Sequence, residues 1–369
     1  MKITDLSLTM IEWPGAKVLY SKYNPVLKAS QIALLTIETD EGVTGQCFLG
    51  SSYRSAQIEA WSVINVLKPA ILGRNALERT LINDSLMPRL NSTSYRAIGA
   101  IDVALWDLAG KVAGMPIHQM IGTRQQSLPT YASSATLPTL EAYVDEAVMV
   151  KELGYVGYKT HPPFDIDIDT NIKLHQRVRD AVGPDFMLMC DPTGVLKYPE
   201  ALKLGLALSE MKYHWYEDPL PYEDIHSYIK LCEKLDIMVM ATEKIPGGLG
   251  AYAPWLTLRA TDALRGDVVV KGGLTPCLMA AHLAHAFHMN YEIHHGGNST
   301  NNIANLHLAM ALPNSAMFEV LLPNEAQQFG VVNDLKLGAD GHMRVPDGPG
   351  LGIVYDDDLL KRHTVEILR

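Results

Sequence analysis

The chain has 369 residues, 47% of them hydrophobic and 20% charged, which is typical of a soluble globular protein. Its formal net charge is −10 and it has no Lys/Arg-rich block that would neutralise phosphates, so nucleic acid is not an expected partner. No run of about 18 apolar residues predicts a membrane span, and the N-terminal MKITDLSLTM lacks the apolar core of a signal peptide. We expect a cytoplasmic protein without a membrane partner.

The cysteines lie far apart in the sequence, and no two form a CxxC pair: they are Cys47, Cys190, Cys232 and Cys277. This spacing is typical of reduced, mostly buried thiols. Core packing explains Cys190 better than a role as a nucleophile does.

The first part of the chain is rich in predicted strands. Residues 3–13 and 31–50 have strand-like patterns, and TDEG within the second range predicts a hairpin turn. Helical periodicity starts near Ser55 and continues through residues 94–114. One apolar stripe of this last helix contains Ile98, Ile101, Leu105, Leu108 and Val112. Gly114 followed by Pro116 predicts its end.

From about residue 127 the pattern becomes an alternation of short apolar strands and helices. The eight strand candidates are residues 128–133, 154–161, 186–192, 214–219, 236–243, 261–267, 289–295 and 316–321. The sixth is the weakest, because TDALRGD has little strand propensity. Eight strands alternating with helices predict an α/β fold of the (β/α)₈ barrel type.

Three carboxylates stand at the carboxyl ends of neighbouring predicted strands, where a barrel places its active site. Asp191, Glu217 and Glu243 are each 26 residues apart, about the length of one strand–helix unit. They are therefore expected side by side at equal heights. Clustered carboxylates repel each other unless a cation lies among them, and an all-oxygen set suits Mg²⁺ better than Zn²⁺. Strand-end surface acids are the alternative.

Further polar residues occupy the other strand ends, namely Lys159, His161, Asp267, His294, His295 and Glu319. Lys159 and His161 are two residues apart in a strand, so their side chains share a face. A solvated strand end with two polar residues would also account for this pair.

The sequence resembles the mandelate racemase subgroup of the enolase superfamily, also called the mandelate racemase/muconate lactonizing enzyme family. The resemblance covers nearly the whole chain. It rests on AIGAIDVALWDLAGK, CDP, YEDPL, ATE, GDVVVKGGLT, VPDGPGLGI and a histidine after the seventh strand. It implies a modified (β/α)₈ TIM-type barrel with an α+β capping domain. We expect the cap at residues 1–126, the barrel at 127–322, and a segment returning to the cap at 323–369.

The resemblance also implies roles for the pair on the second barrel strand. The family carries a K-x-K pair there, and its second lysine is a base on one face of the substrate. Here the pair is Lys159-Thr160-His161, which departs from the pattern. A histidine has an unperturbed pKa near 6.5 and can act as acid or base near neutrality. Alternatively this face has no base, and Lys159 supports the site electrostatically.

On the opposite face the family uses a His–Asp dyad, which maps onto Asp267 and His294. Alternation sends His294 and His295 to opposite faces, so only one can bond Asp267 while facing substrate. Glu319 matches an acid that hydrogen-bonds a developing enediolate oxygen. Lys244 is expected to point away from the site by alternation and form a salt bridge, and Lys271 is expected to be structural.

Substrate contacts are expected from two capping-domain loops and from the loop after the seventh strand. The candidates are Tyr20, Lys22, Tyr23, Asn24, Ser51, Ser52, Tyr53, His295, Asn298, Asn301 and Asn302. Solvated loop residues would explain any one of the capping-loop positions equally well. Such polar contacts favour a hydroxylated substrate.

The resemblance implies an enzyme with one Mg²⁺ per subunit that abstracts the proton α to a substrate carboxylate and forms an enediolate. The preferred reaction is dehydration of a sugar acid to a 2-keto-3-deoxy acid. Racemisation or epimerisation, or cycloisomerisation, of a hydroxy-carboxylate is the alternative. A non-catalytic homologue that binds carboxylates is a remote further alternative. Family members are homo-oligomers, from dimer to octamer, and the same is expected here.

Overall fold

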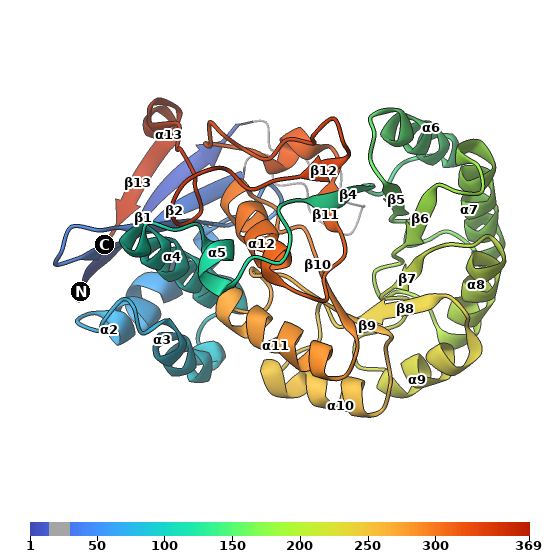
Figure 1. Cartoon of the computed structure of the whole chain (residues 1–369), viewed down its shortest axis with the longest axis horizontal. Coiled ribbons are helices and arrows are strands. Elements are labelled where there is room, and N and C mark those ends of the chain that lie inside the picture. Colours follow the sequence, from blue (N-terminus) through green and yellow to red (C-terminus); the bar gives the residue numbers. More distant parts are fainter. Residues whose placement is uncertain (15–29) are drawn as a thin grey trace.

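The computed structural model describes residues 1–14 and 30–369, and its first sheet is a four-stranded antiparallel one. The strand order is β13-β1-β2-β3, with β1 (Ile3–Trp13), β2 (Ser30–Thr39), β3 (Gly45–Leu49) and β13 (Thr364–Leu368). The predicted turn connects β2 to β3, and Gly42 takes a φ of 79° there. The C-terminal strand therefore pairs with the N-terminal one, as the red and blue arrows of Figure 1 show.

Five α-helices follow the first three strands. They are α1 (Gln57–Ser62), α2 (Lys68–Ile71), α3 (Arg79–Leu86), α4 (Tyr95–Ala113) and α5 (Ile117–Ile121). The long helix α4 confirms the predicted one: the Ser94 hydroxyl accepts a hydrogen bond from Ala97 N at its start, and Gly114 ends it with a φ of 65°. Its predicted apolar stripe is buried except at Val112, which is 42% exposed because the last turn extends beyond the packed surface.

The second sheet is a nearly closed parallel barrel. Its strands are β4 (Leu128–Ser133), β5 (Gly157–Thr160), β6 (Met187–Cys190), β7 (Trp215–Glu217), β8 (Met238–Ala241), β9 (Ala263–Gly266), β10 (Asn290–Ile293) and β11 (Phe318–Leu321). The short β12 (His342–Met343) pairs with β4. All eight predicted strands are confirmed. The weak sixth candidate forms β9 because it is paired on both sides, by β8 and β10, which outweighs its low propensity.

Helices surround the barrel on its outer side (Figure 1). They are α6 (Leu140–Glu152), α7 (Ile168–Val182), α8 (Tyr198–Glu210), α9 (Ile225–Lys234), α10 (Tyr252–Thr257), α11 (Leu274–Ala286) and α12 (Ser299–Ala311), and α13 (Asp357–His363) precedes β13. No helix in the described ranges is long and apolar enough to cross a membrane.

The barrel interior has an apolar floor with charged residues above it. The floor contains Tyr131, Met189, Trp215, Met240, Ala263 and Met317. Because side chains two residues apart in a strand share a face, each strand places its next inward residue one step nearer the carboxyl end. Those residues include Asp191 above Met189, Glu217 above Trp215 and Arg265 above Ala263. Strand period alone thus brings the charged groups together at the mouth.

Helix α4 holds the cap against the barrel. Its buried Asp102 accepts hydrogen bonds from Asn83 Nδ2 at 3.1 Å and from Thr275 N, at the start of α11, at 2.9 Å. A Cβ on Gly99 would lie 2.5 Å from the Val268 carbonyl oxygen, so only glycine permits this close approach. This segment of α4 therefore packs against the barrel and positions the cap on it.

The four cysteines are free thiols, and Cys190 is fully buried. Burial raises the pKa of Cys190 well above its usual range, so the thiol stays protonated. Its place in the packing between barrel and helices confirms the structural interpretation.

Candidate active site

One layer of the barrel consists of four charged side chains from alternate strands. Lys159 lies on β5, Glu217 on β7, Arg265 on β9 and Glu319 on β11, and each is at most 2% exposed. Lys159 Nζ donates to Glu217 Oε2 at 2.7 Å and lies 2.7 Å from Glu319 Oε1. Filling a layer from alternate strands is how a barrel packs its interior. We call these four residues the charged layer.

Arg265 completes the charged layer and was missed from the sequence. Its Nε lies 2.6 Å from Glu217 Oε1 as an ion pair without hydrogen-bond alignment, and its Nη2 donates to Glu319 Oε2. Positive and negative groups therefore alternate around the layer. The sequence could have predicted it, because Arg265 lies two positions before Asp267 and so shares its inward face of the strand. It was overlooked because its strand was the least certain of the eight.

The charged layer decides the protonation of Lys159 and Glu319. Burial alone would lower the pKa of Lys159 and so would Arg265, but Glu217 and Glu319 outweigh both and raise it. Burial alone would raise the pKa of Glu319, but Arg265 and Lys159 hold it well below its usual range. Glu319 also accepts a hydrogen bond from His295 N at 3.1 Å. In this arrangement Glu319 is an ionised acceptor, and its role as an acid that hydrogen-bonds an enediolate oxygen stays a prediction.

The three expected metal ligands do not converge on one point. Within residues 1–14 and 30–369, no three Asp, Glu, His or Cys side chains are grouped so as to hold a metal ion. Asp191 and Glu243 stand at the carboxyl ends of β6 and β8, but Glu217 is turned toward Lys159 and Arg265. In these side-chain positions the two cations hold Glu217, so the three acids as expected metal ligands stay a prediction.

The residue types at this end of the barrel nevertheless fit Mg²⁺. The acids are all-oxygen donors, buried and carried by three neighbouring strands. A fourth, Asp218, is 1% exposed, and neither of its carboxylate oxygens has a hydrogen-bond partner in the described part of the chain. Burial, Asp191, Glu243 and Glu217 raise the pKa of Asp218 well above its usual range. Such an excess of buried negative charge favours a cation.

His161 lies on one side of the mouth and faces hydrogen-bond acceptors with both ring nitrogens. Nδ1 is 2.7 Å from the Ser134 carbonyl oxygen, and Nε2 is 3.0 Å from Asp191 Oδ2. A ring that carries a proton on each nitrogen can donate to both of these acceptors. Lys159 and His161 share a face, as predicted, but Lys159 is fully buried whereas the His161 side chain is 14% exposed.

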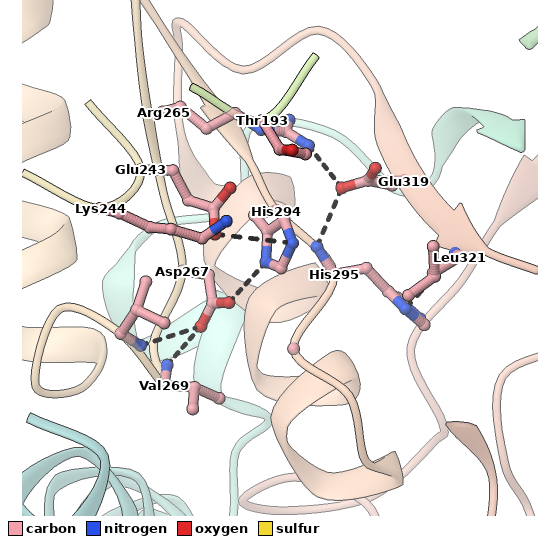
Figure 2. Close-up of polar contacts among 12 residues, drawn as sticks. Thr193, Glu243, Lys244, Arg265, Asp267, Val269, His294, His295, Glu319 and Leu321 are labelled. Carbon is pink, nitrogen blue, oxygen red and sulfur yellow. Dashed lines mark hydrogen bonds and ion pairs between the residues drawn. The ribbon is translucent and has the colours of Figure 1, made fainter. Parts of the chain in front are cut away.

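His294 forms the expected hydrogen bond with Asp267 on the other side of the mouth. Its Nδ1 lies 2.7 Å from Asp267 Oδ2, while Asp267 Oδ1 accepts from the backbone N–H groups of Val269 and Val270 (Figure 2). Burial alone would lower the pKa of His294, but Glu243, the Asp267 hydrogen bond and Glu319 raise it. The Nε2 atom is left for chemistry and lies 3.8 Å from Glu243 Oε1.

Lys244 does not point away from the site, contrary to the alternation argument. Thr242 has a φ of 91°, which interrupts the strand period just before it. Lys244 Nζ consequently lies 3.6 Å from Glu243 Oε1, and Figure 2 shows the two side chains beside each other near His294. Lys244 and His294 together lower the pKa of Glu243 to about 2, although burial opposes this. The lysine is thus part of the mouth.

His295 is not at the mouth, so its expected contact with substrate is wrong. The ring is 2% exposed, packs against Phe318 and accepts a hydrogen bond from Leu321 N at 3.4 Å. Burial lowers the pKa of His295 to about 4, so it remains neutral. Alternation along β10 sends it to the outer face, and only His294 turns inward.

Asn298 is also structural. Its side chain caps α12 by accepting from Asn301 N at 3.0 Å, and its Nδ2 donates to the Gly50 carbonyl oxygen at 2.7 Å. Asn301 Nδ2 donates to Phe48 O, and Asn302 accepts from Gly296 N. These three side chains join the barrel to the cap and do not bind substrate as expected.

One capping-loop residue does reach the barrel mouth. A Cβ on Gly297 would meet the Tyr53 hydroxyl at 2.9 Å, so Tyr53 lies directly on the loop after β10. Burial raises its pKa, and Arg96, Asp267, Glu243 and Lys244 are all near enough to act on it. Its neighbours Ser51 and Ser52 are buried. The other candidates, Tyr20, Lys22, Tyr23 and Asn24, lie outside the described residues.

The fold and this set of residues define a modified TIM-barrel enzyme with a capping domain. The family models Enolase C-terminal domain-like and Mandelate racemase / muconate lactonizing enzyme, N-terminal domain match residues 142–359 and 24–122. The chain therefore belongs to the mandelate racemase/muconate lactonizing enzyme family of the enolase superfamily.

Known relatives extend over nearly the whole chain. An arabinonate dehydratase of Saccharolobus solfataricus is 25% identical and covers 90% of both chains. A D-xylonate dehydratase of Haloferax volcanii is 27% identical and covers 99% of this chain and 89% of its own. The crystal structure of D-glucarate dehydratase from Agrobacterium tumefaciens complexed with magnesium is 28% identical, has a TM-score of 0.88 and covers 99% and 100% of the two chains.

Proposed function

We propose that the protein is a Mg²⁺-dependent sugar-acid dehydratase, which removes the proton α to a carboxylate and expels a β-hydroxyl group as water. The observation that carries the proposal is the His294–Asp267 dyad on one side of the mouth, with His161, directly after β5, at another. Each histidine lies beside one of the expected metal ligands, His161 beside Asp191 and His294 beside Glu243. A substrate held at those acids would have a proton acceptor and a proton donor within reach.

The roles of the two histidines follow from their hydrogen bonds. His294 donates its Nδ1 proton to Asp267, which leaves the Nε2 lone pair to take the α-proton. His161 faces an acceptor with each ring nitrogen, so in its protonated form it is suited to give a proton to the leaving hydroxyl group. The C–O bond then breaks, water leaves, and the resulting enol becomes a 2-keto-3-deoxy acid.

The remaining residues provide charge and binding. Lys159 keeps its proton and serves as a fixed positive charge beneath the site. One Mg²⁺ per subunit, held by Asp191, Glu217 and Glu243, would stabilise the negative charge that develops on the substrate carboxylate. The three named dehydratases among the relatives support a sugar acid as substrate. We also propose a cytoplasmic homo-oligomer, which size-exclusion chromatography with light scattering checks.

Racemisation or epimerisation at Cα is the second candidate, because a histidine stands on each side of the mouth. The same two side chains would then remove and return the α-proton from opposite faces. The outcome depends on whether His161 protonates an oxygen or a carbon.

A screen of mono- and diacid sugars with Mg²⁺ in D₂O separates these reactions. Dehydration gives a 2-keto acid, whereas epimerisation gives deuterium at Cα without loss of water. E243Q is the control, because it removes an expected metal ligand and keeps both residues of the His294–Asp267 hydrogen bond. Absence of both products from every sugar acid, with metal bound, contradicts the proposal.

A further inference from the structure

Glu217 has an unusual position for a residue expected to bind a metal. Both of its carboxylate oxygens already face a positive group, Oε2 at 2.7 Å from Lys159 Nζ and Oε1 at 2.6 Å from Arg265 Nε. Both side chains of each pair are 0% exposed, so water does not screen these contacts. A metal ion at Glu217 would have to share the carboxylate with these two cations and would be repelled by their charge.

We propose that Arg265 is a positioning residue that competes with the divalent cation for Glu217 and thereby sets the metal affinity of the site. This inference rests on the proposed Mg²⁺ site but goes beyond it. Lys159 also contacts Glu217, but it is needed at the site as a fixed charge. Of the three expected metal ligands in the described part of the chain, Arg265 forms an ion pair with Glu217 alone.

Glu319 contacts the same two cations as Glu217 and therefore competes with Glu217 for them. Arg265 Nη2 donates to Glu319 Oε2, and Lys159 Nζ lies 2.7 Å from Glu319 Oε1. Each cation is thus shared between Glu217 and Glu319. Removing the charge of Glu319 leaves both cations to Glu217 alone, whereas removing Arg265 leaves one cation between two carboxylates. The two changes must therefore shift the metal affinity in opposite directions.

The test is Mg²⁺ binding measured by isothermal titration calorimetry, with no substrate present. R265Q is expected to bind Mg²⁺ about tenfold more tightly than the wild type, a change of about 1.4 kcal/mol. E319Q is expected to bind it about tenfold more weakly. A purely structural role would weaken binding in both variants. Equal or weaker binding by folded R265Q overturns the inference.

K271M is the matched control for long-range charge. Lys271 is another buried cation at this end of the barrel. Its Nζ donates to the Ile245 carbonyl oxygen and forms no ion pair among the described residues. Its removal is expected to change Mg²⁺ affinity less than threefold. A gain equal to that of R265Q would mean that net charge, and not competition for Glu217, explains the result, which overturns the inference.

A charge-balanced double variant keeps the test valid if R265Q does not fold. R265Q/E319Q removes one charge of each sign from the layer, and Lys159 and Glu217 remain as a pair. It is expected to bind Mg²⁺ more tightly than E319Q, and equal or weaker binding overturns the inference. If the wild type binds no Mg²⁺, or E243Q binds it as well as the wild type, the proposed metal site itself fails. If only the Arg265 comparisons fail, that site stands and the competition does not.

Discussion

Replacing Asp267 with asparagine tests the dyad most directly, because it keeps the shape of the side chain and changes one proton. In the protein Asp267 Oδ1 accepts from two backbone N–H groups, so an asparagine would place its carbonyl oxygen there. Its NH₂ group would then face His294 Nδ1 at the position where Oδ2 now accepts at 2.7 Å. A donor at that position forces the imidazole proton onto Nε2. The atom expected to take the α-proton would already carry one.

The expected loss is about 10³- to 10⁴-fold in α-proton abstraction, as found when a dyad histidine is held in the wrong tautomer. Since each tenfold in rate is about 1.36 kcal/mol, this is about 4 to 5.5 kcal/mol of transition-state stabilisation. The assay is incorporation of deuterium at Cα in D₂O, which isolates proton removal from the loss of water. A D267N rate within about threefold of the wild type, with His294 still in place, would refute the assignment of the base.

The pH dependence of the same exchange reaction gives an independent check. The base form of His294 is the deprotonated one, so the rate rises as pH rises through its pKa. Glu243 and Asp267 raise that pKa above its ordinary value, although burial opposes them. D267N removes one raising influence, so the rising limb of its profile should move to lower pH. A shift to higher pH would contradict the electrostatic account of the dyad.

Three other substitutions test single assignments. H161A should lower dehydration by about 10²- to 10⁴-fold yet retain deuterium exchange at Cα, and loss of both to the same extent would contradict the division of roles. K159M should destabilise the fold by about 3–5 kcal/mol in urea denaturation, because Glu217 and Glu319 lose a buried partner; unchanged stability would mean that Lys159 is not needed for charge balance. N298A should lose about 1 kcal/mol of stability with KM unchanged, whereas a raised KM at normal stability would restore its role in substrate binding.

Strand period accounts for most of what could be predicted from the sequence. It located the eight barrel strands and correctly sent His294 and His295 to opposite faces, whereas the family resemblance selected His294 as the partner of Asp267. The argument failed at Lys244, where the positive φ of Thr242 interrupts the alternation. A conformation of this kind depends on the surrounding fold and leaves no signal in the local pattern.

Long-range contacts account for the other errors. Asn298 looked like a polar loop residue, but its side chain bonds Gly50, which is 248 residues away in the sequence. The state of Glu319 depends on Arg265 and Lys159, which come from two other strands. Such partners become visible only when the barrel brings alternate strands together, so a residue-by-residue comparison with a family could not show what charges surround Glu319.

The charged layer also determines which charged side chains of the barrel remain free to contact a ligand. Two cations and two carboxylates neutralise each other below the mouth, and a buried set of this kind contributes little to stability compared with apolar residues of the same volume. Its effect is to fix Lys159 and to restrain Glu217. The charges that remain for a ligand are therefore those above it, the acids Asp191 and Glu243 and the side chains of His161, His294 and Lys244. An anionic substrate would meet the Lys244 ammonium group and the N–H groups of the two histidines there, on strands that surround the two acids.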